Sequence, residues 1–234
     1  MTTECKVIGH RGAMGLEPEN TLRSIRRALE LGVDGVEFDV QNIDGALLIF
    51  HDEMLERTTN GEGELIDHSV EYLRQLDAGK GEKIPLLSEV VDLIGNQAFI
   101  NIELKGLDTA SLVMDLVKLL DKERFKKEQF IISSYHYSEL YLVHQLDPEI
   151  KIGVIVDEQS VAALDFADEI DAYSLHPRFS LLDHELVHEA HAAGMKVYVH
   201  TVNDLAKIQH AKQLGVDGVF TDYPDRVLEF LKQS

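Results

Sequence analysis

Acidic, basic and imidazole side chains stand at the ends of short apolar, strand-like runs throughout this sequence. The charged and imidazole groups at such places are His10, Arg11, Glu37, Asp39, His51, Glu103, Lys105 and His200. Other runs end in Ser133-Ser134-Tyr135, His176 and Thr221-Asp222. Parallel α/β folds place their active residues at the carboxyl ends of strands, which meet at one edge of the sheet. We therefore expect these side chains to converge on a single site.

Three carboxylates in this set favour a bound cation. Glu37 and Asp39 are two residues apart, so on a strand their side chains share a face, and Glu103 and Lys105 have the same spacing. Carboxylates gathered inside a fold repel each other and resist desolvation, and a divalent cation is the simplest remedy. Oxygen ligands favour Mg²⁺ or Ca²⁺ over zinc or copper. The spacing leaves open that the carboxylates face solvent or pair with Lys105 and Arg11.

His10 and His51 are candidates for an acid–base pair, because imidazole titrates near neutral pH. The chain has 11 histidines, and these two differ from most of the others in following a strand beside charged neighbours. Arg11 and Lys105 supply positive charge that, together with a metal, could hold a phosphate. This set predicts a metal-assisted hydrolase of a phosphate ester. His200 could face the substrate or simply end a strand.

Strand-like runs alternate with helical patterns from one end of the chain to the other. The strand-like runs are Lys6–Gly9, Gly35–Gln41, Ala46–His51, Phe99–Leu104, Phe130–Ser133, Lys151–Val156, Ala172–Leu175, Lys196–His200 and Gly218–Thr221. The helical patterns are Asn20–Leu31, Ser111–Leu120, Ser138–Leu146, Val161–Ile170, His184–Ala193 and Leu205–Leu214. This alternation implies a parallel sheet. The length fits a closed (β/α)8 TIM barrel, with a doubly wound open sheet as the alternative.

The alternation of strand-like and helical patterns is interrupted once. We expect a single domain over residues 1–234 with a small insertion at residues 53–85, after an early strand.

The composition limits the classes of binding partner and the location of the protein. The net charge of −20 makes nucleic acid and anionic lipid poor partners. The single Cys5 excludes an internal disulfide. Because the sequence has neither a transmembrane-length apolar run nor a signal-peptide pattern at Met1–Lys6, we expect a cytoplasmic protein.

A set of motifs in chain order resembles the glycerophosphodiester phosphodiesterase family. The motifs are Ile8-Gly9-His10-Arg11-Gly12, Glu17-Pro18-Glu19-Asn20-Thr21, Val36-Glu37-Phe38-Asp39-Val40, His51-Asp52, Leu55-Glu56-Arg57-Thr58-Thr59-Asn60-Gly61, Glu103-Leu104-Lys105, Gly194-Met195-Lys196-Val197, Thr201-Val202-Asn203 and the run from Gly215 to Pro224. The resemblance spans nearly the whole chain. A His-Arg-Gly triplet alone is a weak signal, whereas this ordered set is highly specific.

The resemblance implies a (β/α) barrel with a small insertion after the His-Asp motif, and an enzyme of lipid and glycerol metabolism. Such an enzyme cleaves glycerophosphodiesters to glycerol 3-phosphate and an alcohol, with one divalent cation, Mg or Ca. The resemblance implies Glu37, Asp39 and Glu103 as metal ligands, His10 and His51 as the acid–base pair, and Arg11 and Lys105 as phosphate ligands. The family commonly has Trp where this chain has His200, which is therefore expected on the alcohol side of the substrate.

Several alternatives stay open at this point. The attacking group is either water or the glycerol hydroxyl of the substrate, which would give a cyclic phosphate. We favour His10 as the base and His51 as the acid, and the reverse assignment is the alternative. The substrate class is open to a lysophospholipase D-like reading, and a non-catalytic phosphate-ligand binding protein is a further possibility. The sequence leaves the oligomeric state open.

Overall fold

Strand β1 (Lys6–Gly9) pairs with β2 (Gly35–Ile43) on one side and with β9 (Gly218–Thr221) on the other, and this closes the sheet. A computed structural model describes residues 5–121, 125–158 and 161–233. The remaining barrel strands are β4 (Phe99–Leu104), β5 (Phe130–Ser134), β6 (Lys151–Val156), β7 (Ser174–Pro177) and β8 (Lys196–Val199). The eight strands of the barrel are parallel, so the predicted (β/α)8 TIM barrel is confirmed and the open sheet is wrong.

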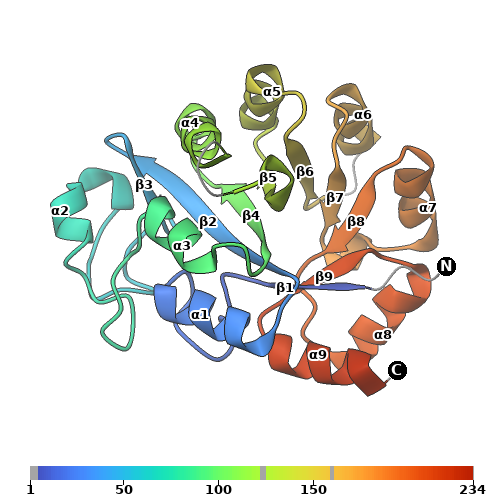
Figure 1. The fold of residues 1–234 in the computed structure, drawn as a ribbon, viewed down its shortest axis with the longest axis horizontal. Helices are drawn as coiled ribbons and strands as arrows, with labels where there is room; N and C mark the ends of the chain where they lie inside the picture. Colours follow the sequence, from blue (N-terminus) through green and yellow to red (C-terminus); the bar gives the residue numbers. More distant parts are fainter. Residues whose placement is uncertain (1–4, 122–124, 159–160, 234) are drawn as a thin grey trace.

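Helices surround the strands, as Figure 1 shows. They are α1 (Leu22–Leu31), α3 (Leu87–Ile94), α4 (Ala110–Asp121), α5 (Tyr137–Leu146), α6 (Val161–Glu169), α7 (His184–Ala192), α8 (Leu205–Leu214) and α9 (Pro224–Gln233). The ends of the six predicted helices differ from these by two residues or fewer, and α3 and α9 had no sequence prediction. Among the described residues, no helix combines the length and apolar character needed to cross a bilayer.

The strand β3 (Ala46–Ile49) corrects one expectation. It pairs antiparallel with β2 and lies outside the barrel, so His51 does not follow a parallel strand. The cause is the turn Asp44-Gly45, in which φ is 50° and 83°. Two consecutive positive φ values are those of a type I′ turn, which joins antiparallel strands and which Asp-Gly favours.

His51 nevertheless reaches the carboxyl end of the barrel. β2 continues beyond the carboxylate of Asp39 as far as Ile43, and β3 then brings the chain back along it. The amide of Phe50 donates to the carbonyl oxygen of Asp39 at 3.1 Å. The hairpin therefore returns His51 to the level of the acidic residues of β2.

Residues 53–85 form an excursion beside the barrel that contains one short helix, α2 (Val70–Leu73), and the 3₁₀ turn Leu65–Asp67. The excursion packs on the β2–β3 hairpin around its own apolar cluster. The buried members of that cluster are Ile43, Leu48, Phe50, Leu55, Leu65, Leu73, Leu76, Ala78 and Ile84. This small core holds the excursion against the hairpin that carries His51. The division of the chain into one domain with an insertion at residues 53–85 stays a prediction.

The barrel interior is apolar at its amino end and polar at its carboxyl end. The apolar cluster consists of Ile8, Ile131, Tyr198 and Phe220, with Phe99 and Tyr173 packed against it. The buried polar side chains include Glu37, Asp39, Asn101, Ser133 and His176. Gly153 makes room for the His176 ring, because a Cβ at Gly153 would lie 2.4 Å from His176 Cε1. The fold thus concentrates its buried polar groups at the end where TIM barrels carry their active sites.

Candidate active site

A cavity of about 350 Å³ opens at the carboxyl end of the barrel. It is lined by His10, Arg11, His51, Glu103, Lys105, Tyr135, Ile155, Asp157, Arg178, His200 and Thr201. A smaller void of about 20 Å³ shares His10, Glu103, Ile155 and His200 with it and is also lined by Glu37. The structure therefore brings the residues singled out in the sequence to one place, with Asp39 buried close by.

Glu37, Asp39 and Glu103 form the acidic centre of this site. One oxygen from each carboxylate lies within 4.8 Å of the others. Glu37 and Asp39 are 2% and 1% exposed. Burial first, and then the charge of Asp39, raises the pKa of Glu37 to about 8. The same two causes, in the same order, raise the pKa of Glu103.

This carboxylate cluster fits a hard divalent cation. Glu37 Oε1 is buried and has no hydrogen-bond partner within the protein, and an unpaired buried carboxylate oxygen is costly. The candidate ligands are all carboxylate oxygens, which Mg²⁺ and Ca²⁺ prefer. A cation there would offset the repulsion that raises the two pKa values.

The loop after β1 holds the two carboxylates of β2 in place. The Arg11 amide donates to Glu37 Oε2 at 2.8 Å, and Arg11 Nε lies 3.2 Å from Asp39 Oδ2. The Asn20 amide group donates to Asp39 Oδ2 at 2.8 Å. Gly12, with φ of 83°, lets this loop pack tightly on α1, because a Cβ there would lie 2.5 Å from Ser24.

His10 is held by an aspartate from the other end of the chain. Its Nδ1 lies 2.6 Å from Asp222 Oδ1, and Asn203 donates to Asp222 Oδ2 at 2.6 Å. Because a carboxylate accepts, this bond places a proton on Nδ1 and leaves Nε2 directed toward Glu37, with 4.0 Å between Nε2 and Oε2. Burial opposes the charged form of His10, but Asp222 and Glu37 outweigh it, so the pKa of His10 is raised.

His51 is held by its neighbour in the sequence. Its Nδ1 lies 2.5 Å from Asp52 Oδ1, and Gln41 Nε2 donates to the carbonyl oxygens of both residues at 3.3 and 2.9 Å. Burial lowers the pKa of His51 despite the nearby carboxylates. The two histidines thus have the same His–Asp arrangement but opposite pKa shifts.

Cations and a third histidine complete the cavity wall. Lys105 donates to Glu103 Oε1 at 3.0 Å, and its Nζ lies 4.6 Å from the centre of the Tyr135 ring. His200 belongs to the opposite wall, with Nε2 3.7 Å from Asp157 Oδ1. Burial lowers the pKa of His200 to about 4. Arg178 pairs with Asp157 at 3.2 Å.

Several contacts of the site had no assigned role in the sequence analysis. They involve Glu19, Asn20, Arg57, Asn203 and Asp222. Each of these residues belongs to one of the quoted motifs, so the motifs contained the signal. Their spacing gave no reason to pair them, because the contacts join loops that follow different strands.

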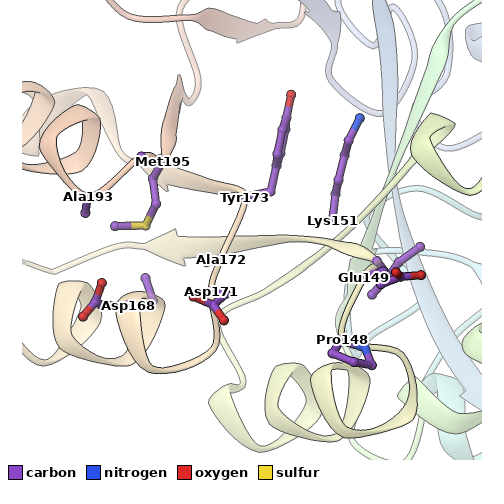
Figure 2. Close-up of a pocket in the computed structure, with 12 residues that line it drawn as sticks. Pro148, Glu149, Lys151, Asp168, Asp171, Ala172, Tyr173, Ala193 and Met195 are labelled. Carbon is purple, nitrogen blue, oxygen red and sulfur yellow. The ribbon is translucent and has the colours of Figure 1, made fainter.

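Another hollow of about 340 Å³ lies at the amino ends of β6, β7 and β8. Figure 2 shows Tyr173 and Lys151 side by side there, with Asp168 and Asp171 below them. Lys151 Nζ lies 4.8 Å from the centre of the Tyr173 ring. This hollow is lined by none of the residues singled out for chemistry, so the cavity at the carboxyl end is the candidate active site.

The chain resembles known proteins over almost its whole length. A sequence model of the glycerophosphoryl diester phosphodiesterase family matches residues 10–226. A glycerophosphodiester phosphodiesterase from Caldanaerobacter subterraneus is 38% identical over 239 residues, covering 97% of this chain and 98% of that protein. One from Bacillus subtilis is 34% identical, covering 93% of this chain and 83% of that protein.

A solved structure agrees with both the fold and the sequence. The phosphodiesterase from Oleispira antarctica, in complex with the product sn-glycerol-3-phosphate, has a TM-score of 0.90 and 34% identity. The match covers 97% of this chain and 96% of that chain. With the matched motifs gathered at one end of a closed barrel, the chain belongs to the glycerophosphoryl diester phosphodiesterase family.

Proposed function

We propose that this protein hydrolyses glycerophosphodiesters to glycerol 3-phosphate and an alcohol, using one divalent cation, Mg or Ca. The observation that carries the proposal is the meeting of two His–Asp pairs and a buried carboxylate cluster at one cavity. The names of the relatives support the substrate class. The sn-glycerol-3-phosphate bound by the Oleispira enzyme as its product supports glycerol 3-phosphate as one of the two products here.

The proposed ligands of the cation are Glu37, Asp39 and Glu103. Lewis-acid polarisation of the phosphoryl oxygens is the chemistry that such a cation supplies when bound. Arg11 and Lys105 supply the positive charge for the phosphate from the protein side. Arg11 pairs with Asp39 and Lys105 pairs with Glu103. Both positive charges therefore lie beside the carboxylate cluster, where a phosphate would bind to the cation.

The two histidines move the protons in this proposal. The base takes a proton from the attacking water or glycerol hydroxyl, and the acid gives one to the departing alkoxide as the P–O bond breaks. We assign the base to His10. Its raised pKa is due in part to the charge of Glu37, which a cation bound at the carboxylate cluster would offset, so that His10 would be more readily neutral in the metal-bound protein. Asp222 is held by the neutral amide of Asn203, so it retains its full negative charge to stabilise the imidazolium that forms. His51 is then the acid.

The opposite wall of the cavity receives the leaving alcohol in this proposal, and His200 lies there. The lining residues are charged or polar with the exception of Ile155. Such a wall offers little apolar surface to an acyl chain, which favours a small polar diester over a lysophospholipid. A cytoplasmic location, the lack of nucleic acid and membrane partners, and a place in lipid and glycerol metabolism stay predictions.

Metal dependence is tested by chelation and by Glu37→Ala. Both should reduce hydrolysis of glycerophosphocholine by more than about 100-fold, the upper end of the loss seen for outer-shell partners of a metal. Readdition of Mg²⁺ or Ca²⁺ should restore the chelated wild type but not the variant. Glu30→Ala, at an exposed acid on α1, is the control. Full activity after exhaustive chelation would contradict the proposed metal dependence.

The raised pKa of Glu37 predicts how the stability of the metal-free protein depends on pH. The folded protein releases this proton near pH 8, whereas an unfolded chain releases it near about 4.3. Between about pH 7 and about pH 8, the folded state holds a proton on Glu37 that the unfolded state has lost. The free energy of unfolding should therefore fall with rising pH, by up to about 1.4 kcal/mol per pH unit.

Urea unfolding in the presence of chelator measures this slope. The window lies above the ordinary histidine pKa of about 6.5, so buried His176 and His200 are mostly neutral in both states and add little to the slope. Glu37→Gln should have a shallower slope, and added Mg²⁺ or Ca²⁺ should stabilise the wild type most at the alkaline end. Equal slopes for the wild type and Glu37→Gln would show that Glu37 is not protonated in this range.

The acid–base pair is tested by replacing each histidine with alanine. Each change should reduce kcat/KM on glycerophosphocholine by about 10²–10⁴, the usual contribution of one general acid or base. The wild type should show a bell-shaped dependence of kcat/KM on pH. A diester with p-nitrophenol as the leaving group should rescue His51→Ala, since that leaving group needs little protonation, but not His10→Ala. Rescue of His10→Ala instead would reverse the assignment, and near-normal turnover by either variant would reject the pair.

His200→Ala should change the choice among diesters more than the chemical step. The ratio of kcat/KM between glycerophosphocholine and glycerophosphoglycerol should shift, by up to about 10-fold for one altered contact. Activity on the p-nitrophenyl diester should remain. An equal loss on every substrate would place His200 in the chemical step and remove it from the alcohol side.

A further inference from the structure

Arg57 belongs to the excursion at residues 53–85, yet its guanidinium binds two carboxylates at the rim of the barrel. Its Nε and Nη2 donate to the two oxygens of Asp52, with 2.9 Å between Nη2 and Oδ1. Its Nη1 and Nη2 donate to the two oxygens of Glu19 at 2.7 and 2.8 Å. The guanidinium therefore joins the loop after β1 to the turn that carries His51.

The contact with Asp52 reaches the active site directly. Asp52 Oδ1 accepts both from Arg57 and from His51 Nδ1, the latter at 2.5 Å. A guanidinium that holds both oxygens of a carboxylate fixes the plane of that carboxylate, which a single hydrogen bond does not do. The hydrogen bond from Arg57 is also the main reason that the pKa of Asp52 is lowered to about 2.

The two His–Asp pairs differ in the charge of the group that holds the aspartate. Asp222, the partner of His10, is held by the neutral amide of Asn203. Asp52, the partner of His51, is held by a cation. A cation on the carboxylate offsets part of its charge and so weakens the support that Asp52 gives to the imidazolium form of His51. A weaker imidazolium is a stronger proton donor.

We propose that Arg57 is a positioning residue that, through its two-point contact with Asp52, orients His51 and strengthens it as the acid for the leaving alcohol. The proposal rests on the proposed function. It adds that the excursion supplies a residue needed for the chemical step. Arg57 acts through Asp52 and contacts no reacting atom.

The partial exposure of Arg57 does not argue against this role. Its side chain is 47% exposed, whereas Asp52 and Glu19 are 21% and 11% exposed. Isolated surface ion pairs contribute little to stability, but two-point arginine–carboxylate contacts within a network are the exception. The proposed effect is on the geometry and acidity of His51, and it does not require a large contribution to folding.

A second path from Arg57 leads away from His51 and must be separated by experiment. Glu19 also accepts from Arg11 Nη1 at 2.7 Å, and Arg11 lies beside Asp39. Loss of Arg57 could therefore let Glu19 draw Arg11 away from the phosphate. That change would weaken binding of every diester, whereas a change at His51 affects only substrates that need an acid.

The test compares Arg57→Met on two substrates. On glycerophosphocholine, kcat should fall by about 10- to 100-fold, the range for outer-shell partners of functional residues. On the p-nitrophenyl diester, kcat should fall by less than about threefold, because a good leaving group needs little proton donation. KM should change little on either substrate. Activity on the p-nitrophenyl diester also shows that the variant is folded.

Two variants isolate the path. In an Asp52→Asn background, Arg57→Met should have little further effect, because the path through Asp52 is already broken. In a Glu19→Gln background, Arg57→Met should keep its full selective effect. Arg57→Lys, which retains the charge but not the fork, should recover part of the lost kcat on glycerophosphocholine.

The matched control is Arg74→Met. Arg74 also belongs to the excursion and also holds a carboxylate with two hydrogen bonds, to Glu89 at 2.7 Å each. Unlike Asp52, this carboxylate is not the partner of a histidine of the proposed acid–base pair, since His10 and His51 are held by Asp222 and Asp52. The Arg74→Met variant should be less stable than the wild type, but its kcat on glycerophosphocholine and on the p-nitrophenyl diester should change by the same factor. If Arg57→Met behaves like Arg74→Met, or if it raises KM equally on both substrates, the proposal is overturned.

This outcome is distinct from a failure of the proposed function. If His51→Ala loses activity selectively on glycerophosphocholine but Arg57→Met does not, only the role of Arg57 is wrong. If His51→Ala retains normal turnover on glycerophosphocholine, the acid itself is wrong. In that case the Arg57 proposal falls with it.

Discussion

The cost of placing three carboxylates together inside the barrel governs the arrangement of the site. Glu37 and Asp39 are almost fully buried, and Glu103 shares their space. A buried carboxylate needs hydrogen bonds or positive charge to remain ionised. The surrounding residues supply both, from the Arg11 amide and guanidinium, from the amide of Asn20, and from Lys105. These donors do not suffice, because the pKa values of Glu37 and Glu103 remain raised. A divalent cation would make up the difference.

The barrel can hold these repelling carboxylates because the apolar residues that stabilise the fold and the polar residues of the candidate site occupy different parts of it. Its amino end is filled by the apolar cluster around Tyr198 and Phe220. The large core lies between the strands and the helices, apart from the acidic centre. The apolar burial that stabilises the fold therefore needs little from the barrel interior at the carboxyl end, which is left for polar groups that repel each other.

Much of this arrangement could be predicted from the sequence, because it depends on short-range periodicity. The alternation of strands and helices indicated the barrel, and the two-residue spacing of Glu37 and Asp39 placed both on one face. The hairpin could have been predicted as well, since Asp44-Gly45 is a turn signal. The strand-helix alternation alone predicts Ala46–His51 as another strand of the parallel sheet. In the structure β3 is antiparallel to β2, and His51 reaches the carboxyl end of the barrel through this hairpin.

The contacts that orient the side chains of the candidate site could not be predicted in the same way, because they join distant loops. Asn20 is the first residue of the helical pattern predicted at Asn20–Leu31, but in the structure Thr21 caps α1 and Asn20 holds Asp39. The pairing of a loop side chain depends on backbone geometry, such as the φ of 56° at Asn20, which composition does not encode. Periodicity assigns a residue to a face of a strand, and tertiary structure assigns its partner.

The two His–Asp pairs show how differently such partners can be obtained. His51 and Asp52 are adjacent in the sequence, so their contact needs only the local turn. His10 follows the first strand and Asp222 follows the last, so their contact exists only where β1 pairs with β9. The His10 amide donates to the Thr221 carbonyl oxygen at 3.0 Å, immediately next to this contact. Closure of the barrel and completion of the proposed base are therefore one structural event, and a chain with an unclosed barrel would lack an oriented His10.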